Sequence, residues 1–186
     1  MIKKLSIATV ILVLAATILA LRRQSLPSFS YTYEERHGGV LVARGERKVK
    51  ANAEWMDRRE YVQTGITGTL IATIATGVVS VRSDRLVMQS PFHGLVHVSK
   101  ESDLRNNPDY FADGNTLGYR TIILKVCDDV GCSYLHFAPQ LQSAMLEAHY
   151  AEGIDIVATS VTIGNQDFSV PNLPVDRTTY DSQLSR

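Results

Sequence analysis

The sequence predicts a mainly β domain of the α+β class: a small antiparallel sheet or barrel with one C-terminal amphipathic helix, preceded by an N-terminal membrane segment. Three observations lead to this class. The run Leu5–Leu21 contains no charged residue. Much of the chain beyond it consists of short segments rich in Val, Ile and Thr, which favour strands, separated by turn residues. Apolar residues recur at helical spacing within Gln140–Glu152.

The apolar run Leu5–Leu21 follows Lys3–Lys4 and is closed by Arg22–Arg23. As a helix it would extend about 25 Å, slightly less than a hydrocarbon core of about 30 Å. A cleaved signal peptide has the same basic start and apolar centre, but cleavage after Ala20 would place Ile18 where a small residue is normal. An uncleaved anchor is therefore the favoured interpretation, with the flanking arginines reaching the lipid headgroups.

The chain divides into four predicted parts. Residues 1–23 form a signal-anchor or signal peptide, 24–30 a linker, 31–164 a β-rich globular domain and 165–186 a flexible C-terminal tail. Such a domain has the usual size of one folding unit. The basic N-terminus favours an N-terminus inside the cell. This orientation places a single-pass protein in a bacterial-type inner membrane with its domain in the periplasm; a cleaved segment would make the protein secreted.

A second run without charge, Val62–Val81, also has the length of a membrane span. Small residues such as Gly65 and Gly68 would give such a helix a packing face. Its many β-branched residues nevertheless prefer strands, and the run separates into two pieces of strand length around Gly77. We expect two buried strands. The alternative is a two-span membrane protein that crosses at 5–21 and 62–81.

Alternating or β-branched segments bounded by turn residues predict the remaining strands. The expected strands are Tyr31–Glu35, Val40–Arg44, Lys48–Trp55, Arg85–Gln89, Gly94–Val98, Tyr119–Val126, Ser133–Phe137 and Ile154–Ile163. The polar stretch Asp103–Gly118 is expected to be a surface loop, because it contains the turn sequences Asn-Asn-Pro and Asp-Gly-Asn. No internal repeat is visible in the sequence.

The segment Gln140–Glu152 changes from strand to helical periodicity. Pro139 suits a helix start, and Gly153 suits the left-handed residue that ends a helix. The residues expected on the apolar face are Leu141, Ala144, Met145, Ala148 and Ala151. This order of strands and helix occurs in several small barrels, including the OB type.

Two cysteines flank a four-residue turn between predicted paired strands. Facing residues of an antiparallel pair lie within disulfide range. We therefore predict a Cys127–Cys132 disulfide in an oxidising compartment, with a structural role. The alternative is a zinc site, since Cys127, Cys132, His136 and His149 offer two sulfurs and two imidazoles. Their spacing is unusual for structural zinc, so the disulfide is favoured and no metal ligand is assigned.

Other candidate sites are weaker. His93 and His97 lie four apart, but a strand would place them about 13 Å from each other. The adjacent Asp128 and Asp129 sit in an expected turn, where they stay solvated. Arg22–Arg59 is rich in basic residues with acidic ones interleaved, which indicates a solvated strand surface or a contact with anionic lipid. No catalytic residue or cofactor is assigned.

Charge and motifs limit the function. Lys plus Arg and Asp plus Glu each number 19, so the formal net charge is zero, which argues against a duplex-binding protein. Tyr31, Tyr33 and Trp55 are too scattered to predict a base-stacking platform. We expect a non-enzymatic interaction module of the cell envelope, tethered by its N-terminal helix. It would bind an envelope protein through a sheet edge or the loop Asp103–Gly118. A zinc-binding or enzymatic domain is the remaining alternative.

Overall fold

The computed structural model describes four stretches of the chain, residues 26–74, 77–82, 85–90 and 99–173. Outside them lie the expected membrane segment 1–23, the predicted strand Gly94–Val98, His93 and His97. Among the helices formed by the described stretches, none has the length and hydropathy of a membrane span.

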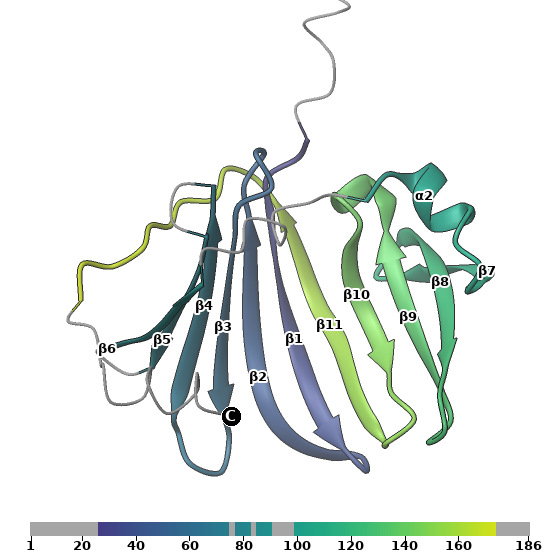
Figure 1. Ribbon diagram of the computed structural model, residues 1–186, viewed down its shortest axis with the longest axis horizontal. Coiled ribbons are helices and arrows are strands. Elements are labelled where there is room, and N and C mark those ends of the chain that lie inside the picture. The colour runs from purple at the N-terminus through teal and green to yellow at the C-terminus, as the bar shows by residue number, and fades with distance from the viewer. Residues whose placement is uncertain (1–25, 75–76, 83–84, 91–98, 174–186) are drawn as a thin grey trace, which may run out of the picture.

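The described residues form one antiparallel sheet, which confirms the mainly β class (Figure 1). Its strands are β1 Phe29–His37, β2 Val40–Val49, β3 Trp55–Tyr61, β4 Thr67–Thr73, β5 Gly77–Arg82, β6 Arg85–Ser90, β7 Tyr110–Thr116, β8 Tyr119–Cys127, β9 Cys132–Ala138, β10 Ala144–His149 and β11 Ile154–Ile163. Two short helical turns interrupt them, α2 Glu101–Arg105 and η2 Pro139–Leu141.

The sheet consists of two meanders that meet at its centre. Strands β1–β6 follow one another across one half, strands β7–β11 follow one another across the other, and β1 pairs with β11 between them. Nine residue pairs join β1 to β11, and nine join β1 to β2. The first and the last strand of the described residues therefore form the seam of the sheet, which lies at the middle of Figure 1.

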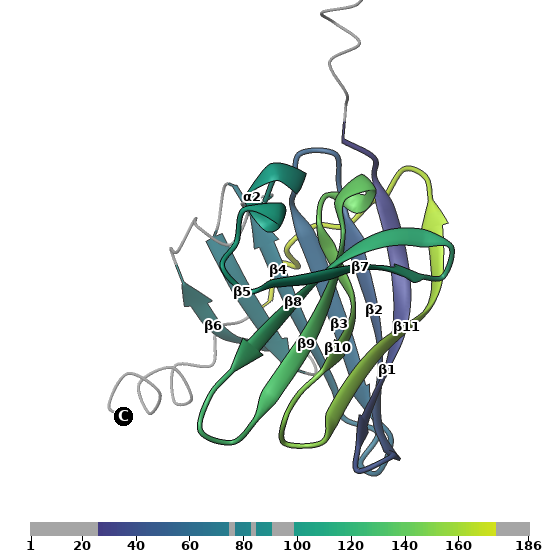
Figure 2. The same cartoon turned by 90° about the vertical axis from the view of Figure 1, so that its right-hand side faces the viewer.

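The sheet is strongly curled. Bulges interrupt the register after Thr32 in the β1–β11 pair and after Glu35 in the β1–β2 pair, and bulges increase local twist. Side chains from β2 and β3 line a common hollow with side chains from β9 and β10, so the two meanders face each other across it. In the view of Figure 2, one meander lies in front of the other. We call the sheet face that lines this hollow the concave face.

Strand β1 supplies the centre of the core because its side chains alternate strictly. Phe29, Tyr31 and Tyr33 point to the concave face and are 0%, 5% and 3% exposed. Thr32 points the other way and shares hydrogen bonds with Thr159 and Ser160 of β11, at 2.8 and 2.7 Å between hydroxyl oxygens. The apolar cluster around these aromatics extends to Val49, Ala138, Leu141, Leu146 and Ala158.

The predicted C-terminal helix Gln140–Glu152 is wrong. The chain makes the single turn η2, and Gln142 and Ser143 then adopt positive φ of 54° and 56°, which ends any helix. Residues 144–149 form β10, which pairs with β9 and β11. A bulge between Met145 and Glu147 offsets the two-residue alternation, so Met145 and Ala148 share one face of the strand, while Leu141 and Ala151 lie outside β10.

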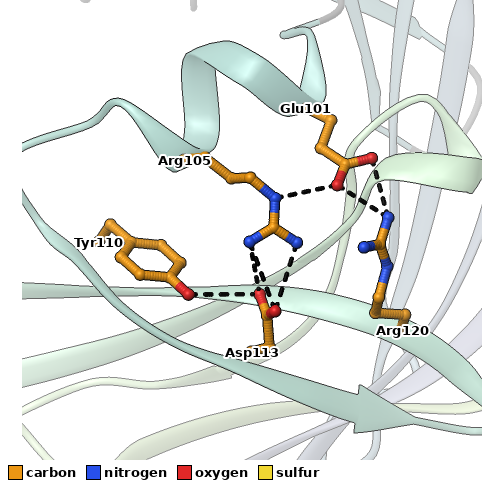
Figure 3. Close-up of polar contacts among 5 residues, drawn as sticks. All are labelled: Glu101, Arg105, Tyr110, Asp113 and Arg120. Atoms are coloured by element: carbon orange, nitrogen blue, oxygen red, sulfur yellow. Dashed lines mark hydrogen bonds and ion pairs between the residues drawn. The ribbon is translucent and has the colours of Figure 1, made fainter.

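The predicted loop Asp103–Gly118 is also wrong, since it contains part of α2 and all of β7. Ion pairs fix it to β8, as Figure 3 shows. Glu101 lies 3.0 Å from Arg105 and 2.8 Å from Arg120, and Arg105 lies 3.1 Å from Asp113 of β7. Gly114 serves close packing rather than a turn, because a Cβ there would lie 2.9 Å from Ile123 Cδ1.

The uncharged run Val62–Val81 forms two strands around Gly77, as predicted. Strand β4 ends at Thr73 and pairs antiparallel with β5, which begins at Gly77. Ile71 and Val79 are 3% and 2% exposed, so the apolar character of the run serves the sheet. The alternative of a second membrane helix at 62–81 is therefore wrong.

The predicted disulfide is confirmed. Cys127 and Cys132 face each other at the end of the β8–β9 hairpin, with 4.0 Å between their Cα atoms. The carboxylate of Asp128 accepts hydrogen bonds from the backbone N–H groups of Val130 and Gly131, at 2.9 and 3.1 Å. The turn is thus organised by Asp128 and closed by the disulfide.

Replacing both cysteines, in a Cys127→Ser/Cys132→Ser variant, should lower the free energy of unfolding by about 2 kcal/mol. A short disulfide loop restricts the unfolded chain by roughly this amount in the entropic treatment. Urea denaturation of the full chain under non-reducing conditions measures the change. Asp129→Ser in the same exposed turn is the matched control and should remain near the wild-type value. Equal stability of the two variants would contradict a stabilising bridge.

Candidate functional site

The concave face carries two neighbouring hollows. One has a volume of about 320 Å³ and the other of about 360 Å³. Both are lined by Arg47 of β2 and Trp55 of β3, so these two side chains stand where the hollows meet. We call the pair of hollows the groove. Its volume falls in the range of ordinary ligand-binding clefts.

The first hollow is mainly apolar. Its apolar walls come from both meanders and from η2, and include Phe29, Tyr31, Val49, Phe137, Leu141 and Met145. One polar group at its edge, Gln142, is 7% exposed and donates hydrogen bonds to the carbonyls of Pro27 and Lys50, at 2.7 and 2.9 Å. This amide ties the start of the described chain to the edge of the hollow.

The second hollow has more charged and hydroxyl-bearing side chains in its lining. It is lined by Asp57, Arg59, Tyr61, Gly68, Thr69, Leu70 and Ser80, in addition to the two shared side chains. Residues 57, 59 and 61 alternate along β3 and therefore point to the same face. The groove as a whole has an apolar end and a polar end.

Arg47 and Trp55 form the boundary between the two ends. The guanidinium carbon of Arg47 lies 4.3 Å from the centre of the Trp55 ring, which is cation–π geometry. Arg47 also lies 4.0 Å from a carboxylate oxygen of Asp57. Because these contacts hold the guanidinium against the indole, the boundary presents a planar donor beside a large aromatic surface.

Tyr33 organises the polar end. Its hydroxyl donates a hydrogen bond of 2.6 Å to Asp57, and Arg59 donates one of 3.3 Å to the same hydroxyl. Burial, together with the neighbouring Asp57 carboxylate, raises the pKa of Tyr33 well above its ordinary value. Tyr33 therefore keeps its proton and donates the hydrogen bond that holds the Asp57 carboxylate in place.

A buried carboxylate completes the network at the end of β1. Glu35 is 7% exposed and lies 2.9 Å from the Arg59 guanidinium and 2.9 Å from His37 Nε2. Burial alone would lower the pKa of Arg59, but Tyr33 and Glu35 outweigh it and raise this pKa. Arg59 thus stays charged. Two arginines and two carboxylates balance each other, so the polar end offers hydrogen-bonding groups without a net formal charge.

The groove was not predicted from the sequence. Arg47 and Arg59 belong to the segment interpreted as a solvated strand surface or a contact with anionic lipid, and the spacing of Tyr31, Tyr33 and Trp55 predicts no base-stacking platform. The structure places all five on neighbouring strands of one face. One signal in the sequence was that Trp55 and Arg59 lie four positions apart, which places them on the same face of a strand. This spacing becomes informative once the pairing of β3 with β2 is known.

The structure separates the four residues of the alternative zinc set. Cys127 and Cys132 are joined to each other, so neither sulfur is free to bind metal. His136 and His149 lie together, with 6.0 Å between ring centres, and both flank Glu147. The sequence could not show Glu147 as a neighbour because the segment was predicted to be a helix.

Similarity to known proteins is confined to the fold. No protein-family model matches the sequence, and no curated protein matches it. An uncharacterized conserved protein from Thermus thermophilus is similar with a TM-score of 0.51 and 12% identity, over 87% of this chain and 97% of that one. PNGF-II is similar with a TM-score of 0.45 and 11% identity, and MucB with 0.41 and 12%. The chain covers 33% of PNGF-II and 60% of MucB, which correspond to 86% and 83% of its own length.

Gly45→Ala should destabilise the protein and disturb the groove. A Cβ at position 45 would enter the volume of the Tyr33 ring, which lies against the backbone of β2. Overpacking of this kind typically costs about 1–3 kcal/mol. Denaturant unfolding of the full chain measures the cost.

Gly68→Ala is the matched control for this substitution. Gly68 lies in β4 and lines the same groove, but a Cβ there meets no atom within 4 Å. We expect this variant to be at least as stable as the wild type, since alanine restricts the unfolded chain more than glycine does. An equal loss of stability in both variants would show that the Tyr33–Gly45 contact is not the cause.

Proposed function

We propose that this chain is a membrane-tethered, extracytoplasmic interaction module that binds an extended segment of another envelope protein in its concave groove. The observation that carries the proposal is the meeting of an apolar hollow and a polar hollow at Arg47 and Trp55. An extended segment of a protein combines apolar side chains with backbone hydrogen-bonding groups. The groove offers complementary surfaces for both.

The side chains that line the groove suit protein recognition. Tryptophan, tyrosine and arginine dominate the energetics of protein interfaces, and Trp55, Tyr31 and Arg47 line the apolar hollow together. Burying one large apolar side chain of a partner in the apolar hollow would contribute about 1.5–3 kcal/mol. The polar end then orients the partner segment, because Arg59, Asp57 and Tyr33 are fixed by one another.

The place of the tether also supports the proposal. Pro27 is bound to Gln142 at the edge of the apolar hollow. Strand β1 begins two residues later, and in Figure 1 the chain enters the sheet at the end where α2 and the β2–β3 turn lie. An anchor before Pro27 would therefore hold the apolar end of the groove toward the membrane. Tethering raises the effective concentration near membrane partners, so modest affinity suffices.

The groove replaces the surface loop proposed from the sequence as the binding surface. Residues 103–118 are held by the ion pairs of α2, β7 and β8 and include a strand of the sheet. Deleting them would therefore remove part of the fold and would not test binding. The groove instead can be probed by single substitutions.

A photo-crosslinking phenylalanine in place of Tyr61 should form an adduct with a specific envelope protein in intact cells. Tyr61 lines the polar hollow and is 39% exposed. Glu60 is the matched control, since it precedes Tyr61 in β3 and points to the opposite face. We expect an adduct from position 61, its loss when Arg47→Ala is added, and none from position 60. Equal adducts from both positions, or none from position 61, would contradict the groove as the interface.

The tether is tested by a topology reporter fused after Arg186. The proposal expects activity from a reporter that works only outside the cytoplasm, and loss of membrane association when residues 1–23 are removed. Activity from a cytoplasmic reporter would contradict the proposed location. Soluble full-length protein that retains residues 1–23 would contradict the tether itself.

A further inference from the structure

Three potential metal ligands gather on the sheet face opposite the groove. Phe137 lines the groove, so its neighbour His136 points to the other face of β9. The register pairs His136 with Glu147 of β10 and pairs His149 with Asp155 of β11. Glu147 and His149 are two residues apart on one strand and therefore share this face. The antiparallel pairing alone thus places two imidazoles beside one carboxylate.

The donor atoms of these residues converge. His149 Nε2 lies 2.7 Å from one oxygen of Glu147, and His136 Nδ1 lies 3.5 Å from the other. One donor atom from each of the three residues lies within 4.8 Å of the others. Ligands bound at about 2.0–2.2 Å around a tetrahedral zinc ion are roughly 3.4 Å from one another. Small side-chain rotations would bring the set to these distances.

Neighbouring groups orient two of the donors. Asp155 lies 2.7 Å from His149 Nδ1, and Thr116, at the end of β7, donates a hydrogen bond of 2.9 Å to Glu147. In metalloproteins a carboxylate commonly accepts the second N–H of a ligating histidine and fixes its tautomer. With Asp155 accepting from Nδ1, the Nε2 lone pair of a neutral His149 is directed at Glu147. Strand β7 crosses this part of the sheet in Figure 2.

Protonation of His149 does not give every polar atom of the cluster a hydrogen-bond partner. A proton on His149 Nε2 would satisfy the contact with Glu147. His136 Nδ1 would still have no hydrogen-bond partner, although it is buried and its side chain is only 16% exposed. A metal ion between the three residues would engage all three donors at once.

We propose that His136 Nδ1, the Glu147 carboxylate and His149 Nε2 bind a zinc ion, with Asp155 as a positioning residue. Two imidazoles and one carboxylate suit zinc and similar divalent transition metals, and they do not suit calcium or magnesium, which prefer oxygen ligands. Three protein ligands leave a fourth coordination position open. His149 is 41% exposed, so this position is accessible to water or to a partner.

Zinc titration of the purified, metal-free full chain in detergent tests the site. The cysteines are kept oxidised so that thiols do not compete. We expect one zinc ion per chain, stabilisation against heat by zinc and none by calcium or magnesium. His136→Gln and His149→Gln should each weaken binding at least about tenfold, and Asp155→Asn by about 10–100-fold. The matched control is His37→Gln, because His37 also contacts a carboxylate, Glu35 at 2.9 Å, without a second histidine.

Cobalt binding to the unaltered chain gives a readout that does not depend on the folding of variants. The proposal expects the intense visible absorption of tetrahedral cobalt, displaced by zinc, and the same spectrum at lower affinity in Asp155→Asn. The weak spectrum of octahedral, solvent-like cobalt would overturn it. Zinc affinity that is unchanged in His136→Gln and His149→Gln, or lost equally in His37→Gln, would also overturn it.

Discussion

The pairing of β1 with β11 is the contact on which the rest of the structure depends. Each meander is built from hairpins between consecutive strands, and either one alone would leave an aromatic face open to water. The nine residue pairs between β1 and β11 join the two meanders into one sheet. The ring of Tyr33 and the small side chain of Ala158 meet across this seam and are both 3% exposed. Bringing β1 and β11 together costs conformational entropy, because a long stretch of chain separates them. The burial of the β1 aromatics offsets this cost.

The seam also determines where the groove lies. Its bulges add twist, and the twist turns β2 and β3 toward β9 and β10. The Tyr33 ring fills the space that a side chain at Gly45 would occupy, so its hydroxyl reaches Asp57 on β3. Polar side chains are thereby brought onto an apolar face without losing their partners. On the opposite face, the same strand register places His136, Glu147 and His149 together.

Local sequence was sufficient to predict strands that pair with a sequence neighbour through a short turn. Ile154–Ile163 was predicted with the bounds that β11 has, and the Cys127–Cys132 hairpin and the two strands around Gly77 were predicted from turn residues and β-branched runs. Such hairpins are specified by contacts between residues close in sequence.

Strand pairing overrode the local sequence pattern in the elements that were predicted wrongly. Residues 144–149 form a strand because β9 and β11 supply partners on both sides, although the apolar residues of this segment have helical spacing. Gly114 resembled a turn residue, but it lies within β7, where the Ile123 side chain approaches its backbone closely. The groove depends on how the two meanders face each other, and the histidine cluster depends on the register between the successive strands β9, β10 and β11. No local pattern around Arg47 or Glu147 contains that register.

Hydrogen exchange of the full chain tests the central claim most directly, because it reports whether the seam holds both meanders together. If the β1–β11 pairing unites the sheet, the amides of β1, β2, β10 and β11 should be the most protected, and β2 and β10 should open with the same free energy. Protection confined to the β8–β9 hairpin, or separate opening of the two meanders while β1 and β11 exchange freely, would contradict the account.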